Sequence, residues 1–298
     1  MLTRREWLAT VPASVLAARG VAAPAKDVFA TENLVAWCIV PFDKKNRTPA
    51  ERVAMLAKLG FKRFAYDWRA QHLPTFDEEV RLLKKAQIEL TAVWFPANLG
   101  AESQQLLAVI KKHDVKPQLW ITMGEPVGKE QAEKVEATAK VLRPIAEEAG
   151  KFGGSVALYN HGGWFGEPEN QLAVIDQLKV KNVGIVYNQH HGHDHVERFP
   201  KLLKLMMPHL LCLNLNGMVK GGDKIGKKIM PMAQGELDVE LLTTIRDSNY
   251  SGPIGILGHT DDDAEERLAD NLDGLAWLRV KLSGKEPGPK PKCRTWKS

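Results

Sequence analysis

The sequence predicts a single (β/α)8 barrel, and three observations support this prediction. After residue 33, short apolar runs alternate with longer amphipathic runs eight times. The eight repeats occupy about 265 residues, the usual length of such a barrel. No GxGxxG or GxxxxGK(S/T) motif follows the first run, which disfavours a doubly wound sheet and a nucleotide cofactor. The apolar runs, taken as strands, are Leu34–Val40, Phe61–Asp67, Leu90–Pro96, Pro117–Met123, Ser155–Asn160, Val183–Asn188, Leu211–Leu215 and Pro253–Leu257.

The runs between these strands carry the signals of helices. Pro49–Gly60 has a proline near its start and a glycine at its end. Thr75–Gln87 has acidic residues early and lysines late, as the helix dipole favours. Glu130–Gly150 is charged on one face and apolar on the other, as expected of a helix on the outside of a barrel. The order strand, helix, strand is therefore expected throughout residues 33–283.

The sixth strand ends in the most informative segment of the chain, Asn182–His195, with the sequence NVGIVYNQHHGHDH. Its apolar part, Val183–Tyr187, predicts a fully buried strand. Four of the nine histidines then fall within His190–His195. Imidazole is a common metal ligand and titrates near neutral pH, so this strand end is where we expect chemistry. The alternative is a solvated polar loop whose histidines have no role.

Aromatic and polar side chains follow the other strands in the same way. Aromatic rings stack on the CH faces of sugars and amides bind hydroxyl groups, so the predicted barrel mouth suits a small polyol. We expect Glu125, His161 and His191 to be catalytic, with Glu125 as the base. The residues expected to bind substrate are Tyr66, Trp94, Asn160, Trp164, Asn214, Asn216, Lys220 and His259.

Three segments carry a resemblance to a known group of proteins. ALYNHGGW (Ala157–Trp164), Val183–His195 and GPIGILGH (Gly252–His259) resemble the xylose-isomerase-like TIM-barrel superfamily, which contains sugar isomerases, sugar-phosphate epimerases and inosose dehydratases. The resemblance covers roughly residues 33–283. It implies isomerase, epimerase or lyase chemistry on a sugar or keto-sugar, in which a base removes a proton next to a carbonyl.

This sequence departs from the superfamily at the metal site. Many members hold one divalent metal with acidic or histidine ligands at the ends of strands five to eight. The corresponding positions here are Tyr159, Asn188, Asn214 and Leu257. None carries a carboxylate or an imidazole, so the metal quartet is degenerate.

Three alternatives follow from this departure. A metal site could be rebuilt from His161, His191 and His193 with a carboxylate from Glu125 or Asp194, a donor set that suits zinc, manganese or iron. The histidines could instead act as acid and base without a metal. Finally, catalysis could be lost. The predicted functions are accordingly an isomerase- or epimerase-like enzyme, a lyase or hydrolase of oxidised keto-glycosides, or a non-catalytic sugar-binding barrel.

The N-terminus predicts export. Thr3–Leu8 (TRREWL) resembles the twin-arginine motif, an apolar region follows to Ala23, and Ala23–Ala25 offers an A-x-A cleavage site. Residues 1–25 are therefore expected to be a signal peptide that directs the protein to the periplasm or beyond the cytoplasmic membrane. The alternative is an amphipathic first helix. The apolar region is too short and interrupted for a membrane span.

Charge and cysteine content set further limits. Residues 1–25 contribute two of the five formal positive charges, so the remaining chain carries about +3, too little to predict nucleic-acid binding. The fold also resembles that of an abasic-site endonuclease group, but the dense Glu/His/Asp set which that group uses for zinc is lacking here. Three cysteines define no disulfide framework. Residues 284–298 are basic and proline-rich, which predicts disorder.

Overall fold

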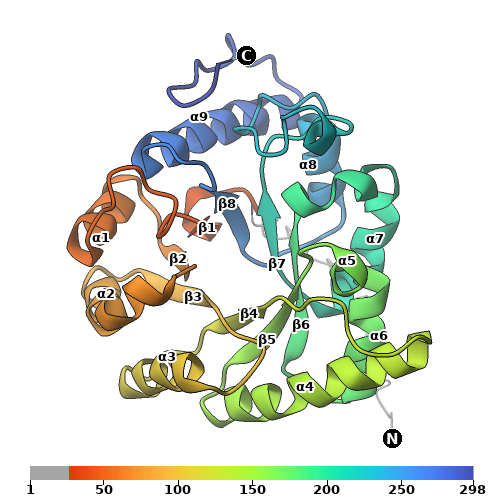
Figure 1. The fold of residues 1–298 in the computed structure, drawn as a ribbon. Helices are drawn as coiled ribbons and strands as arrows, with labels where there is room; N and C mark the ends of the chain where they lie inside the picture. Colours follow the sequence, from red (N-terminus) through yellow and green to blue (C-terminus); the bar gives the residue numbers. More distant parts are fainter. Residues whose placement is uncertain (1–26, 298) are drawn as a thin grey trace, which may run out of the picture.

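The computed structural model describes residues 27–297 and shows eight parallel strands closed into one barrel in chain order (Figure 1). Each strand pairs with the next along the chain, and the first also pairs with the last. The predicted (β/α)8 fold is thereby confirmed. The strands are β1 (Leu34–Trp37), β2 (Arg63–Tyr66), β3 (Glu89–Trp94), β4 (Gln118–Ile121), β5 (Ser155–Tyr159), β6 (Val183–Asn188), β7 (Leu210–Leu215) and β8 (Ile254–Leu257).

Helices form a ring around this barrel (Figure 1). The first helix begins with a capping box, because Thr48 accepts a hydrogen bond from the amide of Glu51 and Glu51 accepts one from the amide of Thr48. The helices are α1 (Pro49–Lys58), α2 (Phe76–Lys85), α3 (Ala101–Lys112), α4 (Gln131–Lys151), α5 (Gly163–Gly166), α6 (Pro168–Leu178), α7 (Phe199–Met206), α8 (Asp238–Asp247) and α9 (Ala264–Leu282). Short 3-10 helices, Gln189–His191 and His193–Arg198, follow β6.

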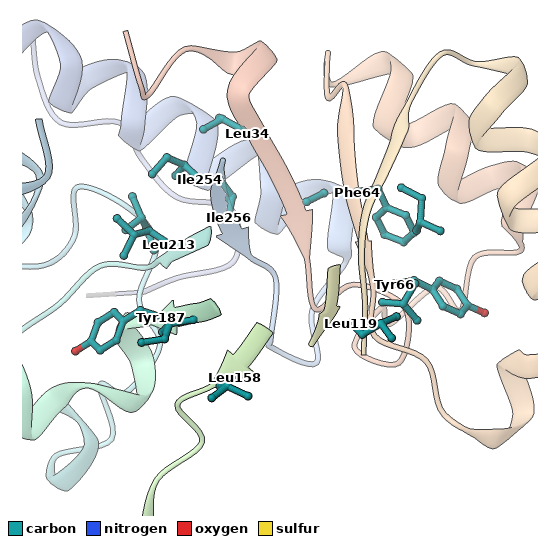
Figure 2. Close-up of a cluster of buried hydrophobic side chains, with 14 of the residues drawn as sticks. Leu34, Phe64, Tyr66, Leu119, Leu158, Tyr187, Leu213, Ile254 and Ile256 are labelled. Carbon is teal, nitrogen blue, oxygen red and sulfur yellow. The ribbon is translucent and has the colours of Figure 1, made fainter. Parts of the chain in front are cut away.

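The alternation of side chains along the strands creates two cores. Leu34, Phe64 and Tyr66 belong to the layer between strands and helices, part of which Figure 2 shows. Residues of the other strand face fill the inside of the barrel, where Trp37 and Trp120 are fully buried. Small side chains at the same level, Ala65, Ala92 and Ala157, leave room for these large rings.

The first strand is shorter than its apolar run predicts. The run continues to Val40, but β1 ends at Trp37. The next residue, Cys38, has a φ of 57°, a left-handed conformation that a strand does not continue through. The chain therefore turns over the barrel rim at this point, and both Cys38 and Phe42 reach the barrel mouth.

The C-terminal segment lies along α9 rather than away from the barrel (Figure 1). The buried carboxylate of Asp270 accepts hydrogen bonds from the amides of Arg294 and Thr295 at 2.9 and 2.8 Å. The indole of Trp277 donates to the carbonyl oxygen of Gly288 at 2.8 Å. These bonds connect the C-terminal segment to α9, whereas the disorder expected from its composition stays a prediction. The predicted signal peptide lies outside the described residues, and no described helix is both long and apolar enough to cross a membrane.

Candidate active site

A small cavity opens at the C-terminal ends of the strands, where active sites of such barrels lie. Its volume is about 100 Å³. The ring of Trp94 lies 5.9 Å from that of Trp37, stacked at 21°, and 5.2 Å from the ring of Tyr159. A larger hollow of about 420 Å³ beside Tyr250 and Arg279 contains no histidine. The small cavity at the strand ends is lined by Trp37, Cys38, Phe42, Asp67, Arg69, Trp94, Tyr159, His161, His191 and His259.

Four histidines gather on one side of the cavity. The ring of His191 lies 4.3 Å from that of His161 and 3.7 Å from that of His190. His259, which follows β8, lies with its ring 5.8 Å from His190. Strands β5, β6 and β8 thus bring together histidines that are distant in the sequence. Of the four histidines predicted at the end of β6, His191 lines the cavity and His190 packs against His191.

These imidazoles are neutral at physiological pH. Burial, followed by repulsion from His161, lowers the pKa of His191 to about 3. Burial also lowers the pKa of His259 to about 4, with the charges of Arg69 and Lys228 adding to the effect. The pKa of His161 is lowered in the same direction, mainly by burial. A neutral imidazole carries one N–H donor and one acceptor nitrogen, so these rings can hydrogen-bond a carbonyl or hydroxyl group of a ligand.

An amide network fixes the histidine segment. The side-chain oxygen of Asn188 accepts hydrogen bonds from Nδ1 and the amide of His190, at 2.7 and 3.3 Å. The amide nitrogen of the same side chain donates to the hydroxyl of Tyr159. The backbone amide of Asn188 donates to the side chain of Asn160 at 2.7 Å. Asn160, predicted to bind substrate, is therefore buried in a structural role beneath the cavity.

Asp67 completes the site and is absent from the residues predicted to act. It follows β2, is 2% exposed, and accepts a hydrogen bond from the amide of Val40 at 3.1 Å. Its second oxygen has no hydrogen-bond partner among the described residues. Burial raises the pKa of this carboxyl to about 6. Because β2 and β6 lie on opposite sides of the barrel, Asp67 and His191 line the cavity from opposite sides.

Several predicted residues lie away from this cavity. Tyr66 packs on Phe76 in the outer layer, and its hydroxyl donates to the carbonyl oxygen of His72. Glu125 is exposed, and its ion pair with Lys134 holds the pKa of Glu125 below the usual value. The structure therefore does not place the predicted base beside the histidines, because its side chain turns towards α4.

The remaining predicted residues are also engaged elsewhere. The indole of Trp164 donates to the side chain of Gln131 at 2.8 Å. Lys220 is 80% exposed and forms an ion pair with Glu197 at 2.5 Å. Asn216 is buried and donates to the carbonyl oxygen of Gly217. Of the residues predicted to bind substrate, Trp94 and His259 line the cavity.

Comparison with known proteins identifies the fold. No family model and no curated protein sequence matches the chain. Solved structures do match it. The 3-keto-D-glucoside 4-epimerase of E. coli is 15% identical, with a TM-score of 0.64, over 84% of this chain and 99% of its own. A D-psicose 3-epimerase is 15% identical with a TM-score of 0.60 over 84% and 99%. A probable 3-DHS dehydratase of Bacillus anthracis is 15% identical with a TM-score of 0.64 over 82% and 98%. This chain shares the (β/α)8 barrel fold of these solved structures.

The side chains at the ends of β5 to β8 do not fit the divalent metal that the sequence resemblance implies. Leu257 has no donor atom, and the side chain of Asn188 is committed to His190 and Tyr159. The side-chain oxygen of Asn214 packs closely against Gly255. A Cβ atom added to Gly255 would lie only 1.7 Å from this oxygen. Across residues 27–297, no three His, Cys, Asp or Glu side chains converge as ligands.

The predicted ligands His161, His191 and His193 are likewise not assembled. The ring of His193 turns away from the other two, and its Nε2 hydrogen-bonds with the carbonyl oxygen of Lys228 at 3.0 Å. The reason is local: the chain turns at Gly192, between the two 3-10 helices. No metal-dependent step follows from this set of donors.

Proposed function

We propose that the protein is an exported enzyme of the isomerase or epimerase type, which moves a proton at a carbon next to the carbonyl of a sugar or keto-sugar. The observation that carries this proposal is the pairing of Asp67 with neutral histidines on opposite sides of one cavity. The fold neighbours include two sugar epimerases and a dehydratase, which supports this class of chemistry.

The roles follow from the protonation states. With a pKa of about 6, the Asp67 carboxyl is mostly ionised at neutral pH and is a suitable base. His161 and His191 are uncharged, so an N–H of either ring can donate to the carbonyl oxygen as negative charge develops there. The C–H bond breaks, its proton goes to Asp67, and its electron pair forms the enolate.

The fate of the enolate defines the reaction. Return of the proton to the former carbonyl carbon, with transfer of the hydroxyl proton from the new carbonyl oxygen to the old one, is isomerisation. Return to the same carbon from the other face is epimerisation. Loss of a leaving group from the next carbon is elimination, which is the lyase alternative. The cavity is small, about 100 Å³, and we place the carbonyl end of the sugar in it. Trp94 borders this space and can stack on the sugar.

Solvent-proton exchange tests the proposed function. In D2O, the protein is expected to introduce deuterium next to the carbonyl of at least one member of a panel of ketoses and 3-keto-glycosides, followed by NMR. The products distinguish isomerisation, epimerisation and elimination. His191→Ala should lower the exchange rate by about 10²–10³-fold, as removal of an oxyanion donor does. His209→Ala, distant from the cavity, is the control. Binding of a sugar without any proton exchange would contradict the proposed reaction and favour a non-catalytic sugar-binding barrel.

Export is tested on the precursor. Arg4→Lys combined with Arg5→Lys is expected to retain the unprocessed protein in the cytoplasm, because the twin-arginine pair of the predicted signal peptide is lost. Cell fractionation and immunoblotting measure the outcome. Arg19→Lys, which changes the third arginine of the same segment, is the matched control. Normal processing of the double variant would contradict export by this pathway.

A further inference from the structure

Two cations at the barrel mouth have no carboxylate partner within salt-bridge distance among the described residues. One is Arg69, which lines the cavity. Its Nη1 donates to the carbonyl oxygens of Asp67 and Trp68 at 2.9 and 2.8 Å, and its guanidinium lies 5.4 Å from the centre of the Phe42 ring. These contacts occupy one nitrogen and hold the group in place. Its remaining N–H groups are left to bind a ligand.

The second cation is Lys228, in the loop between β7 and α8. The carbonyl oxygen of this residue is held by His193 Nε2 at 3.0 Å and by the side chain of Asn216 at 3.3 Å. The loop is thereby fixed to the histidine segment. The charge of Lys228 also lowers the pKa of each of four clustered histidines, so its ammonium lies within electrostatic range of them. These histidines are His161, His190, His191 and His259.

Other lysines of the same loop differ from Lys228. Lys220 pairs with Glu197 at 2.5 Å, and Lys224 pairs with Asp194 at 3.2 Å. Both ammonium groups are directed to acids of the neighbouring loop. Asp261 is the opposing charge at the rim, and its effect is to raise the pKa of His259. Lys228 and Arg69 therefore outnumber the acids at the rim of the cavity, whereas the acid at its base is Asp67.

We infer that the substrate is a sugar acid, whose carboxylate binds at the rim between Arg69 and Lys228 while its carbonyl end enters the cavity. His259 and Phe42, with ring centroids 3.8 Å apart, lie at the same rim as Arg69. A guanidinium can bind a carboxylate with two parallel hydrogen bonds, and an ammonium adds a point charge.

This inference rests on the proposed function only in using the same cavity, and binding measurements test it separately from catalysis. Titration of the full mature chain, followed by calorimetry and tryptophan fluorescence, compares uronates and keto-aldonates with their neutral sugars and with sugar phosphates. We expect at least one uronate or keto-aldonate to bind about tenfold or more tightly than its neutral counterpart, a difference of about 1.4 kcal/mol. The preference should weaken as salt is added.

Matched variants test whether Arg69 and Lys228 bind the carboxylate of the sugar acid. Arg69→Gln and Lys228→Gln should each lower the affinity for the sugar acid about tenfold, and should lower the affinity for the neutral sugar less. The controls are Arg81→Gln on α2 and Lys224→Gln in the loop that holds Lys228. Each removes an exposed cation that does not line the cavity, and neither should change the affinity for either ligand. Equal affinity for acids and neutral sugars, or tighter binding of sugar phosphates, would overturn the inference.

The outcomes separate this inference from the proposed function. Proton exchange on neutral sugars with no preference for acids would refute the sugar-acid substrate and leave the proposed reaction standing. Tight binding of a sugar acid that depends on Arg69 and Lys228, with no exchange on any sugar, would support the ligand and refute the reaction.

Discussion

Replacing Asp67 with asparagine is expected to lower the rate of proton exchange about 10²–10⁴-fold, the contribution typical of a general base, while the barrel becomes more stable. Asparagine has the size of aspartate and can still accept the hydrogen bond from the amide of Val40. An amide cannot take up the substrate proton. The variant therefore removes the proposed chemistry without removing the local structure.

The gain in stability follows from the raised pKa. In the unfolded chain Asp67 has the ordinary aspartate pKa of 3.8, whereas burial raises the pKa to about 6 in the folded protein. The folded state therefore binds the proton more tightly, and stability is lost as the pH rises from about 4 through 6. A shift of about two pKa units corresponds to about 3 kcal/mol at neutral pH. The gain in the variant is smaller than this, because a buried amide also lacks one partner.

Two pH series check this prediction. In the wild type, kcat/KM should rise with pH below 6 and level off above 7, because the base must be ionised. Urea unfolding should show a larger stability difference between variant and wild type at pH 8 than at pH 5. Asp77→Asn removes an exposed carboxylate of α2 that pairs with Lys112, and is the control: it should leave the kcat/KM series unchanged and bring no gain in stability at pH 8. Full exchange activity in Asp67→Asn, with loss in Glu125→Gln, would return the role of base to Glu125.

The fold could be predicted because its evidence is local and repeated. Hydrophobic period and strand–helix alternation are properties of short segments, and β6 has the predicted bounds Val183–Asn188. The end of β1 could not be predicted in this way. Cys38, Ile39 and Val40 continue the apolar run, but the left-handed conformation of Cys38 ends the strand. This conformation depends on contacts at the barrel rim between residues distant in the sequence, such as the hydrogen bond from the amide of Val40 to Asp67.

The site could be predicted in part, where its residues are adjacent in sequence. The histidines after β6 form a visible cluster, whereas Asp67 is one acid among many. A signal for Asp67 does exist, because β2 places Phe64 and Tyr66 on its outer face and Ala65 on its inner face. Continuing this alternation by one residue turns Asp67 into the barrel and Tyr66 away from it. The side-chain direction of Glu125 has no comparable signal, because an ion pair across a loop decides it.

Beneath the rim, a buried ion pair joins the two helices that follow β1 and β2. The guanidinium of Arg52 on α1 donates to both carboxylate oxygens of Glu79 on α2, at 3.0 and 2.7 Å. The two side chains are 3% and 0% exposed. Arg52 also donates to the carbonyl oxygen of Arg47, whose guanidinium pairs with Asp43 and with Asp263 beyond β8. The pair thus supports the loops around the cavity.

Glu79→Ala is expected to lower the free energy of unfolding by about 3–5 kcal/mol, because it leaves the charge of Arg52 buried without its partner. Urea unfolding measures the loss. Glu78→Ala, which breaks an exposed pair with Arg81 at 3.8 Å, is the matched control and should cost less than about 1 kcal/mol. Replacing both members, Arg52→Met with Glu79→Leu, removes the unpaired charge and should restore most of the stability. If the double variant were as unstable as Glu79→Ala, the loss would instead come from packing between α1 and α2, and the charge of Arg52 would not be its cause.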